Sequence, residues 1–224
     1  MVQKTMNVHT LQSRQDGVRV PIAVADSHVH LTAAVIEQLF CDHYRLHVGS
    51  VASQPTQFAA IESVTLLGPN GRRLRGVKII GPPRASNQIE ISRTDAQLLG
   101  IRAPTRESGD LIGTPGIILE GPRSRVALGT GVICAHRHLH ASPEEAARLA
   151  LTDRQWVAVA TSGHNRSLLF EDVLVRVSPQ YRLEFHLDSD EANAAGVRSG
   201  DEGILKQGRG VSRPDAQSST VPTE

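Results

Sequence analysis

The chain has 224 residues, a formal net charge of +1 at pH 7 and a sequence pI near 8.0. This balanced charge, with aromatic residues at only 3%, excludes the basic, aromatic-rich surface typical of nucleic-acid-binding proteins. Two cysteines exclude a disulfide scaffold, and no apolar run approaches the length of a membrane span. We therefore expect a cytoplasmic protein with no nucleic-acid or membrane partner.

Taken in chain order, the sequence predicts a polar arm, many short strands and a few brief helices. Residues 1–17 are weakly patterned and predict a flexible arm, and residues 207–224 predict a disordered tail. Between them lie β-rich runs punctuated by Gly, Pro and Asn: "VRVPIAVA", "SVTLLG", "GVKIIG", "QIEIS", "GIILEG", "GVICA", "WVAVAT", "VLVRVS" and "RLEFHL". The segment "SPEEAARLAL" predicts a helix with Ser142 as N-cap, Pro143 in the first turn and Glu145 completing a capping box.

This pattern predicts a mostly β fold class: two small β-barrel domains related by an internal repeat, each capped by short α-helices. In both halves a His-x-His precedes a short helix, a hairpin, a strand and a helix that ends at glycine. When Gly100 is set against Gly196, Arg84 falls opposite Gln180 and Glu90 falls opposite His186.

The two His-x-His segments are the strongest functional signal. Residues i and i+2 of a strand share a face, so His28 and His30, or His138 and His140, direct two imidazoles into one space. One such pair alone is more simply interpreted as two histidines on a solvent-exposed face of a strand. The repeat adds a third ligand-type residue to each pair and favours metal binding. The predicted metal ligands are His28, His30 and Glu90 from one half, and His138, His140 and His186 from the other.

Three nitrogen or oxygen ligands with one open position are typical of catalytic zinc sites. If the two sets meet between the halves, they form a two-metal centre; zinc is the default, although imidazole also suits copper, iron and nickel. Arg84, six residues before Glu90, is well suited to bidentate phosphate binding, although alone it is more simply a surface arginine. Cys134 in "GVICA" is more simply a small buried residue than a ligand or nucleophile.

Eight segments between Val20 and Val197 carry a resemblance to a known family: "HVHL", "SQPTQFAA", "ESVTLLGP", "GPPRASNQIEISRTDA", "RESGDLIGTPGI", "HRHLHASPEEA", "FEDVLVRVSP" and "LDSDEANAA". On these segments the chain resembles the phosphate propanoyltransferases of bacterial microcompartments, a family of phosphotransacylases. The resemblance implies two β-barrels with two Zn²⁺ ions per chain between them, and reversible transfer of a propanoyl or acetyl group between coenzyme A and inorganic phosphate.

By the same resemblance, the metal held by His28, His30 and Glu90 meets the coenzyme A sulfur, and the metal held by the three later histidines faces water or phosphate. Arg84 matches the family's phosphate-binding arginine. Three residues match positions that bind coenzyme A: Lys78, Ile80 and Asn193. The family also implies a homo-oligomer, and for some members location inside a microcompartment among its shell or core proteins. Residues 1–17 are a candidate encapsulation peptide.

The sequence departs from the family at two places. Ala25-Asp26-Ser27 stands where the family usually has Ser-Asn-Arg, and Ser50 stands where it tends to have lysine. As in the family, we expect residues 18–26 to cross over and join residues 136–206 in one barrel, with residues 27–135 forming the other. Two alternatives to the phosphotransacylase stay open. They are a metal-dependent hydrolase of thioesters or acyl phosphates, and a non-catalytic metal-stabilised scaffold.

Overall fold

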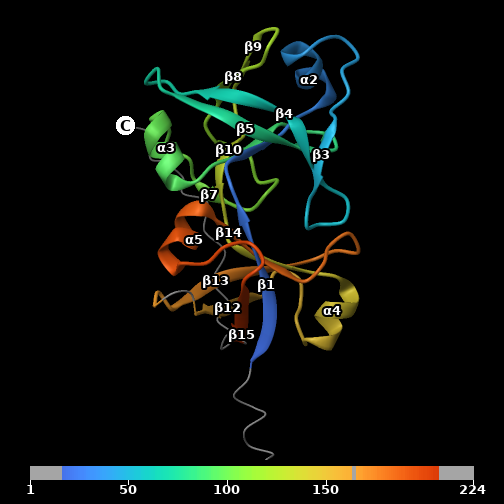
Figure 1. The fold of residues 1–224 in the computed structure, drawn as a ribbon, viewed down its shortest axis with the longest axis vertical. Helices are drawn as coiled ribbons and strands as arrows, with labels where there is room; N and C mark the ends of the chain where they lie inside the picture. Colours follow the sequence, from blue (N-terminus) through green and yellow to red (C-terminus); the bar gives the residue numbers. More distant parts are fainter. Residues whose placement is uncertain (1–16, 163–164, 207–224) are drawn as a thin grey trace, which may run out of the picture.

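The computed structural model describes residues 17–162 and 165–206, which form two β lobes stacked along the long axis (Figure 1). The predictions for residues 1–16 and for the tail at 207–224 lie outside the described residues. The mostly β fold class is confirmed. Within the described residues one lobe is a closed barrel, whereas the sheet of the other is curled and ends at β7 and β9.

The closed barrel combines the first strand that the structure describes with five strands that follow residue 137. Its strand order is β1-β14-β11-β13-β12-β15. The strands span β1 (Val18–Ala25), β11 (His138–Ala141), β12 (Trp156–Thr161), β13 (Leu168–Val177), β14 (Glu184–Asp188) and β15 (Glu202–Lys206). Its interior is aliphatic with two phenylalanines, Phe170 and Phe185, whose ring centroids are 5.8 Å apart. The scarcity of aromatic residues in the sequence therefore shows directly in this core.

The curled sheet occupies the other lobe, in the order β7-β10-β6-β2-β5-β4-β8-β9, with β3 paired to β4. The strands span β2 (His28–His30), β3 (Val48–Val51), β4 (Phe58–Leu67), β5 (Arg73–Gly81), β6 (Gln88–Glu90), β7 (Thr105–Arg106), β8 (Ile117–Glu120), β9 (Arg125–Leu128) and β10 (Val132–Ala135). Alternate residues of β4 face the core, and Glu62 is among them. Its buried carboxylate accepts a hydrogen bond from Tyr44 Oη at 2.9 Å and lies 2.6 Å from His47 Nδ1, which satisfies the charge.

Within residues 17–162 and 165–206, four short helices pack on the lobes: α2 (Ala33–Leu39), α3 (Arg93–Leu99), α4 (Pro143–Arg148) and α5 (Ser189–Ala195). The capping box predicted at Ser142 and Glu145 is confirmed, with Pro143 in the first turn. Both α3 and α5 end at a glycine in the left-handed region, Gly100 with φ of 71° and Gly196 with φ of 64°. Glycine adopts that conformation without a Cβ penalty, which explains why both halves end this helix in the same way.

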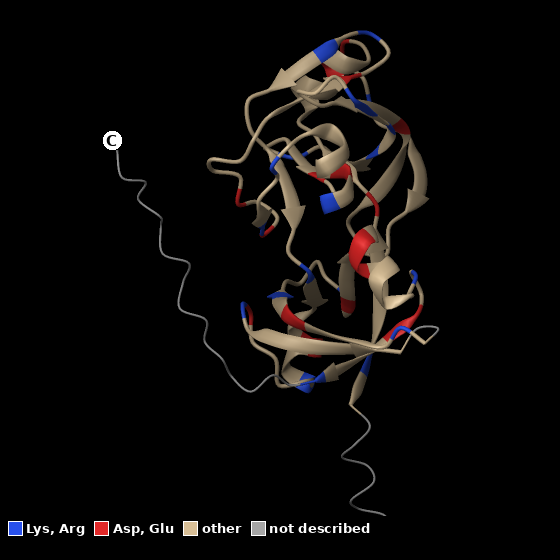
Figure 2. Ribbon diagram, turned by 90° about the vertical axis from the view of Figure 1, so that its left-hand side faces the viewer, with Lys and Arg blue, Asp and Glu red and all other residues tan. Residues whose placement is uncertain are grey.

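Strand β1 carries the chain from the barrel into the curled sheet (Figure 1). It runs parallel to β14, with Ile22 opposite Phe185, and antiparallel to β15. The chain passes between the lobes at residues 26–27 and returns at residues 136–137. Lysines, arginines, aspartates and glutamates are interspersed over both lobes (Figure 2), in keeping with the small net charge.

Replacing Leu139 with alanine should destabilise the barrel strongly. Leu139 lies between the two histidines of β11 but points to the opposite face, where it is fully buried in the barrel core. Because truncation leaves a cavity, we expect the free energy of unfolding to fall by about 2–5 kcal/mol. Urea denaturation measures the loss. The control is Leu169→Ala, at an exposed position of β13, which should change stability by no more than about 0.5 kcal/mol. An equal loss in both variants would contradict the assignment.

Candidate metal centre

The two His-x-His segments form the short strands β2 and β11, and each pairs with the strand that carries the third candidate ligand. In the curled sheet His28 lies opposite Glu90 on antiparallel β6. In the barrel His138 lies opposite His186 on antiparallel β14. The same pairing in both lobes produces two sets of three ligand atoms, each set lying within 4.8 Å. We call these sets the first triad (His28, His30, Glu90) and the second triad (His138, His140, His186).

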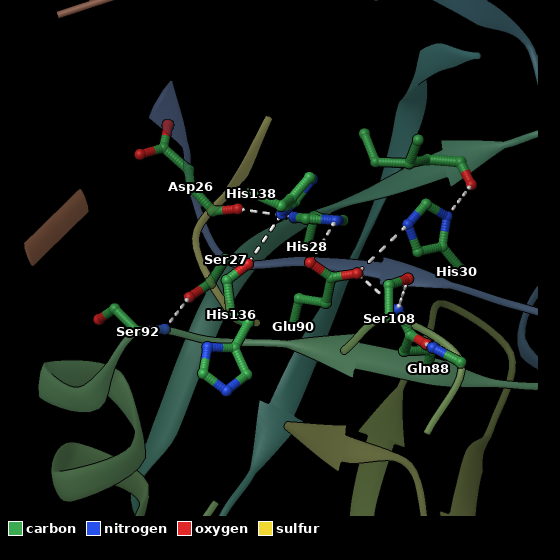
Figure 3. Close-up of polar contacts among 12 residues, drawn as sticks. Asp26, Ser27, His28, His30, Gln88, Glu90, Ser92, Ser108, His136 and His138 are labelled. Carbon is green, nitrogen blue, oxygen red and sulfur yellow. Dashed lines mark hydrogen bonds and ion pairs between the residues drawn. The ribbon is translucent and has the colours of Figure 1, made fainter. Parts of the chain in front are cut away.

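In the first triad the Glu90 carboxylate lies between two imidazoles (Figure 3). One oxygen is 3.7 Å from His28 Nε2, and the other is 3.9 Å from His30 Nε2. A tetrahedral ion with bonds of about 2.0–2.1 Å separates its ligand atoms by roughly 3.3–3.4 Å. The three groups are therefore spaced close to what a shared ion requires.

Backbone carbonyls set the orientation of three of the histidines. His28 Nδ1 lies 2.8 Å from the Asp26 carbonyl oxygen, and His138 Nδ1 lies 2.8 Å from the His136 carbonyl oxygen. His30 Nδ1 lies 3.1 Å from the Ile80 carbonyl oxygen. A ring that donates from Nδ1 presents the Nε2 lone pair on its other side, which is how histidine ligands are commonly prepared for a metal.

The second triad contains polar atoms without a hydrogen-bond partner. Both ring nitrogens of His140 and Nε2 of His186 are buried and make no hydrogen bond. His186 Nε2 lies 2.9 Å from a Glu184 carboxylate oxygen, at the distance of an ion pair. Buried polar atoms are rarely left unpaired, so the His140 ring, which has no such partner, fits a site completed by a bound ion. On its other side, His140 stacks on Tyr181 with ring centroids 3.8 Å apart.

The protonation states also favour a metal. Burial, together with the neighbouring His28 and Arg84 charges, lowers the pKa of His30 to about 3. Burial and His186 likewise lower the pKa of His138 to about 3. Burial alone would raise the pKa of Glu90, but the neighbouring His28, His30, His138 and Arg84 outweigh it and bring the pKa to about 2. Neutral imidazoles and an ionised carboxylate are the forms that bind a metal ion.

Both triads line one cavity of about 920 Å³ whose walls come from both lobes. Arg84, which follows β5, also lines the cavity, and its backbone N–H donates to the Leu31 carbonyl at 2.9 Å. Burial lowers the pKa of its guanidinium, and Glu90 opposes that effect. Among the described residues, no carboxylate forms an ion pair with this guanidinium, so its charge is directed at the cavity.

The remaining predicted residues fall into two groups. Lys78 and Ile80 line the cavity on β5, where Lys78 lies in register with His28. Asn193 is exposed on α5 and is not among the cavity-lining residues. Cys134 is buried in the core of the curled lobe, as predicted.

At the position where the resemblance implies an arginine, Ser27 Oγ donates to Asp95 Oδ2 at 2.5 Å. In the other half, Arg137 contacts Glu191 at 3.4 Å. The serine therefore keeps the link between the His-x-His strand and the following helix, but it brings no positive charge to the cavity.

Sequence reasoning missed the polar residues that hold the triads. Gln88, two residues before Glu90, donates to a Glu90 oxygen at 2.5 Å and to Ser108 Oγ at 2.7 Å. Glu184, two residues before His186, lies beside that imidazole. Strand alternation places residues i and i−2 on one face, so this signal was available in the sequence. By contrast, the contact of Gln54 with Glu184 joins two lobes that local sequence cannot align.

Comparisons with known proteins show which family the chain belongs to. The family model described as phosphate propanoyltransferase matches residues 21–198. A protein of Thermotoga maritima named phosphate propanoyltransferase is 43% identical over 201 residues, which is 90% of this chain and 94% of that protein. One of the same name from Salmonella typhimurium is 49% identical over 178 residues, 80% of this chain and 84% of that protein.

The two lobes, their shared cavity and these matches identify the chain as an acyltransferase. In the part of the chain that the structure describes, no helix is both long and apolar enough to cross a membrane. The chain belongs to the phosphate propanoyltransferase family.

Proposed function

We propose that this chain transfers a short acyl group, propanoyl or acetyl, reversibly between coenzyme A and inorganic phosphate at a dinuclear zinc site. The observation that carries the proposal is the meeting of both triads and Arg84 around one cavity. A single triad would serve simple hydrolysis, whereas two triads and an unpaired guanidinium suit a reaction with two anionic substrates. The names of the relatives point to the same reaction.

In the forward direction a phosphate oxygen attacks the thioester carbonyl, the carbon–sulfur bond breaks, and coenzyme A leaves as a thiolate. Arg84 would hold phosphate through a fork of N–H donors matched to its oxygens, which brings a poor nucleophile next to the carbonyl. The buried setting strengthens this attraction because little water screens it.

The two triads would hold the zinc ions. His28, His30 and Glu90 supply two neutral ligands and one anionic ligand, and the second triad supplies three neutral ligands. When bound, zinc stabilises a thiolate and polarises an oxygen ligand. We propose that the first triad serves the coenzyme A sulfur and the second serves phosphate. Lys78 and Ile80 line the cavity where they could contact coenzyme A.

An assay of the purified protein with propanoyl-CoA, with and without phosphate, tests the proposal. We expect thiol release that requires phosphate and yields propanoyl phosphate, and elemental analysis should find about two zinc ions per chain. Thiol release at the same rate without phosphate would instead indicate a hydrolase. No release from protein that contains its metal would indicate a scaffold. Encapsulation through residues 1–17 and a homo-oligomer stay predictions.

A further inference from the structure

The two triads differ in where they place a carboxylate. The repeat sets Glu90 against His186, and two residues earlier it sets Gln88 against Glu184. The first triad therefore has its carboxylate as a candidate ligand and an amide two residues before it. The second triad has an imidazole as ligand and a carboxylate two residues before it. Each lobe therefore has one carboxylate at these two positions. It stands at the ligand position in the first triad (Glu90) and two residues before the ligand position in the second (Glu184).

Glu184 is not a member of the second triad, because the cluster of ligand atoms within 4.8 Å contains only the three histidines. It lies in register with His140 on the neighbouring strand. Its Oε2 is 2.9 Å from His186 Nε2. The carboxylate therefore contacts one triad imidazole without belonging to the ligand set, which is the position of an outer partner that orients a ligand.

The other lobe sets the position of Glu184. Ser53 Oγ donates to Glu184 Oε2 at 2.5 Å, and Gln54 Nε2 donates to the same oxygen at 2.8 Å. The Gln54 side chain also accepts a hydrogen bond from the Arg182 N–H at 3.1 Å, and it is only 3% exposed. Ser53 and Gln54 precede β4 of the curled sheet, so these hydrogen bonds cross the interface between the two lobes.

We propose that Glu184 is a positioning residue for the second triad: it orients His186 for a metal ion, and Ser53 and Gln54 of the opposite lobe hold it in place. Glu184 faces Nε2 of the His186 ring and leaves Nδ1 for the ion. The contact between the two lobes thereby sets the affinity of the second triad for its metal ion. This inference rests on the dinuclear site of the proposed function and assigns a role to a residue outside both triads.

The variant Glu184→Gln tests this role. The amide keeps the size of the side chain, and its carbonyl oxygen still accepts hydrogen bonds from Ser53 and Gln54. The contacts across the interface between the lobes are therefore preserved. Loss of an outer carboxylate typically lowers metal affinity about 10–100-fold. Titration of the zinc-loaded protein with a chelator should show one of two ions released at about 10–100-fold lower chelator concentration. The other ion and the unfolding midpoint of the metal-free protein should stay unchanged.

The matched control is Glu171→Gln, an exposed position on β13 of the same barrel. It removes the same charge and should leave both zinc affinities unchanged. Ser53→Ala, which removes one donor to Glu184 from the other lobe, should weaken the same single site by a smaller factor. A role in folding alone would instead lower the unfolding midpoint of the metal-free protein.

Two results would overturn the inference while leaving the proposed function intact. One is release of both ions from Glu184→Gln at the chelator concentrations that the parent protein requires. The other is equal weakening of both ions. If the parent protein holds no metal at all, the dinuclear site itself fails. Counting the zinc ions of the parent protein before the variants are compared therefore separates the two failures.

Discussion

Replacing His30 with alanine should remove one metal ion per chain and lower kcat about 10³-fold. His30 is 3% exposed, and the Ile80 carbonyl oxygen lies 3.1 Å from its Nδ1. The replacement therefore removes a pre-oriented ligand that water cannot readily replace. A metal ion contributes several kcal/mol of transition-state stabilisation, and each 1.4 kcal/mol is about a factor of ten in rate. Elemental analysis and steady-state kinetics with propanoyl-CoA measure both effects.

The control for this experiment is His43→Asn. His43 is exposed and has a positive φ of 58°, a conformation that asparagine tolerates better than most residues. It lies outside both triads and the cavity, so metal content and kcat should match those of the parent protein. If His30→Ala retained two ions and full activity, the first triad would not be a metal site.

Replacing Arg84 with alanine should raise the KM for phosphate about 10²-fold and leave about two zinc ions per chain. Truncating one partner of a buried charge pair typically costs about 2–5 kcal/mol, and the lower part of that range corresponds to this factor. Arg84 lines the cavity but belongs to neither triad, so metal binding should persist. The KM for propanoyl-CoA should change much less than the KM for phosphate.

Two further variants sharpen the assignment of Arg84. Arg84→Lys keeps the charge but loses the planar fork, so it should recover only part of the phosphate affinity. Arg102→Ala removes an exposed arginine outside the metal cavity and should leave both KM values unchanged. An unchanged phosphate KM in Arg84→Ala would remove this residue from the phosphate site.

The sequence predicted much of this architecture because its strongest signals are local. Alternation in β2 and β11 places two imidazoles on one face, and the repeat adds Glu90 and His186. Capping at Ser142 and the terminal glycines at Gly100 and Gly196 also depend on a few neighbouring residues. In each case the interaction spans only a few positions along the chain or is duplicated between the halves.

The rest depends on contacts between segments far apart in the sequence. Whether the first-half sheet closes depends on how its outer strands β7 and β9 lie, and no local pattern gives that. In the sequence Gln54 looks like an ordinary polar loop residue. In the structure its side chain is buried against Arg182 and Glu184 of the other lobe. Tyr181 gave no signal either, although it stacks on His140. These roles appear only once the chain has folded and distant segments lie side by side.

The crossing of β1 has a consequence for how the protein is made. Val18–Ala25 leaves the ribosome before every other strand that the structure describes, but its barrel neighbours β14 and β15 are the last two of those strands to be translated. The segment 28–135 can fold first, while β1 waits as an unpaired strand. Parallel pairing across such a long stretch of chain forms slowly. A nascent chain halted before Glu184 therefore has neither a closed barrel nor a complete second triad, so activity begins only after β14 has been synthesised.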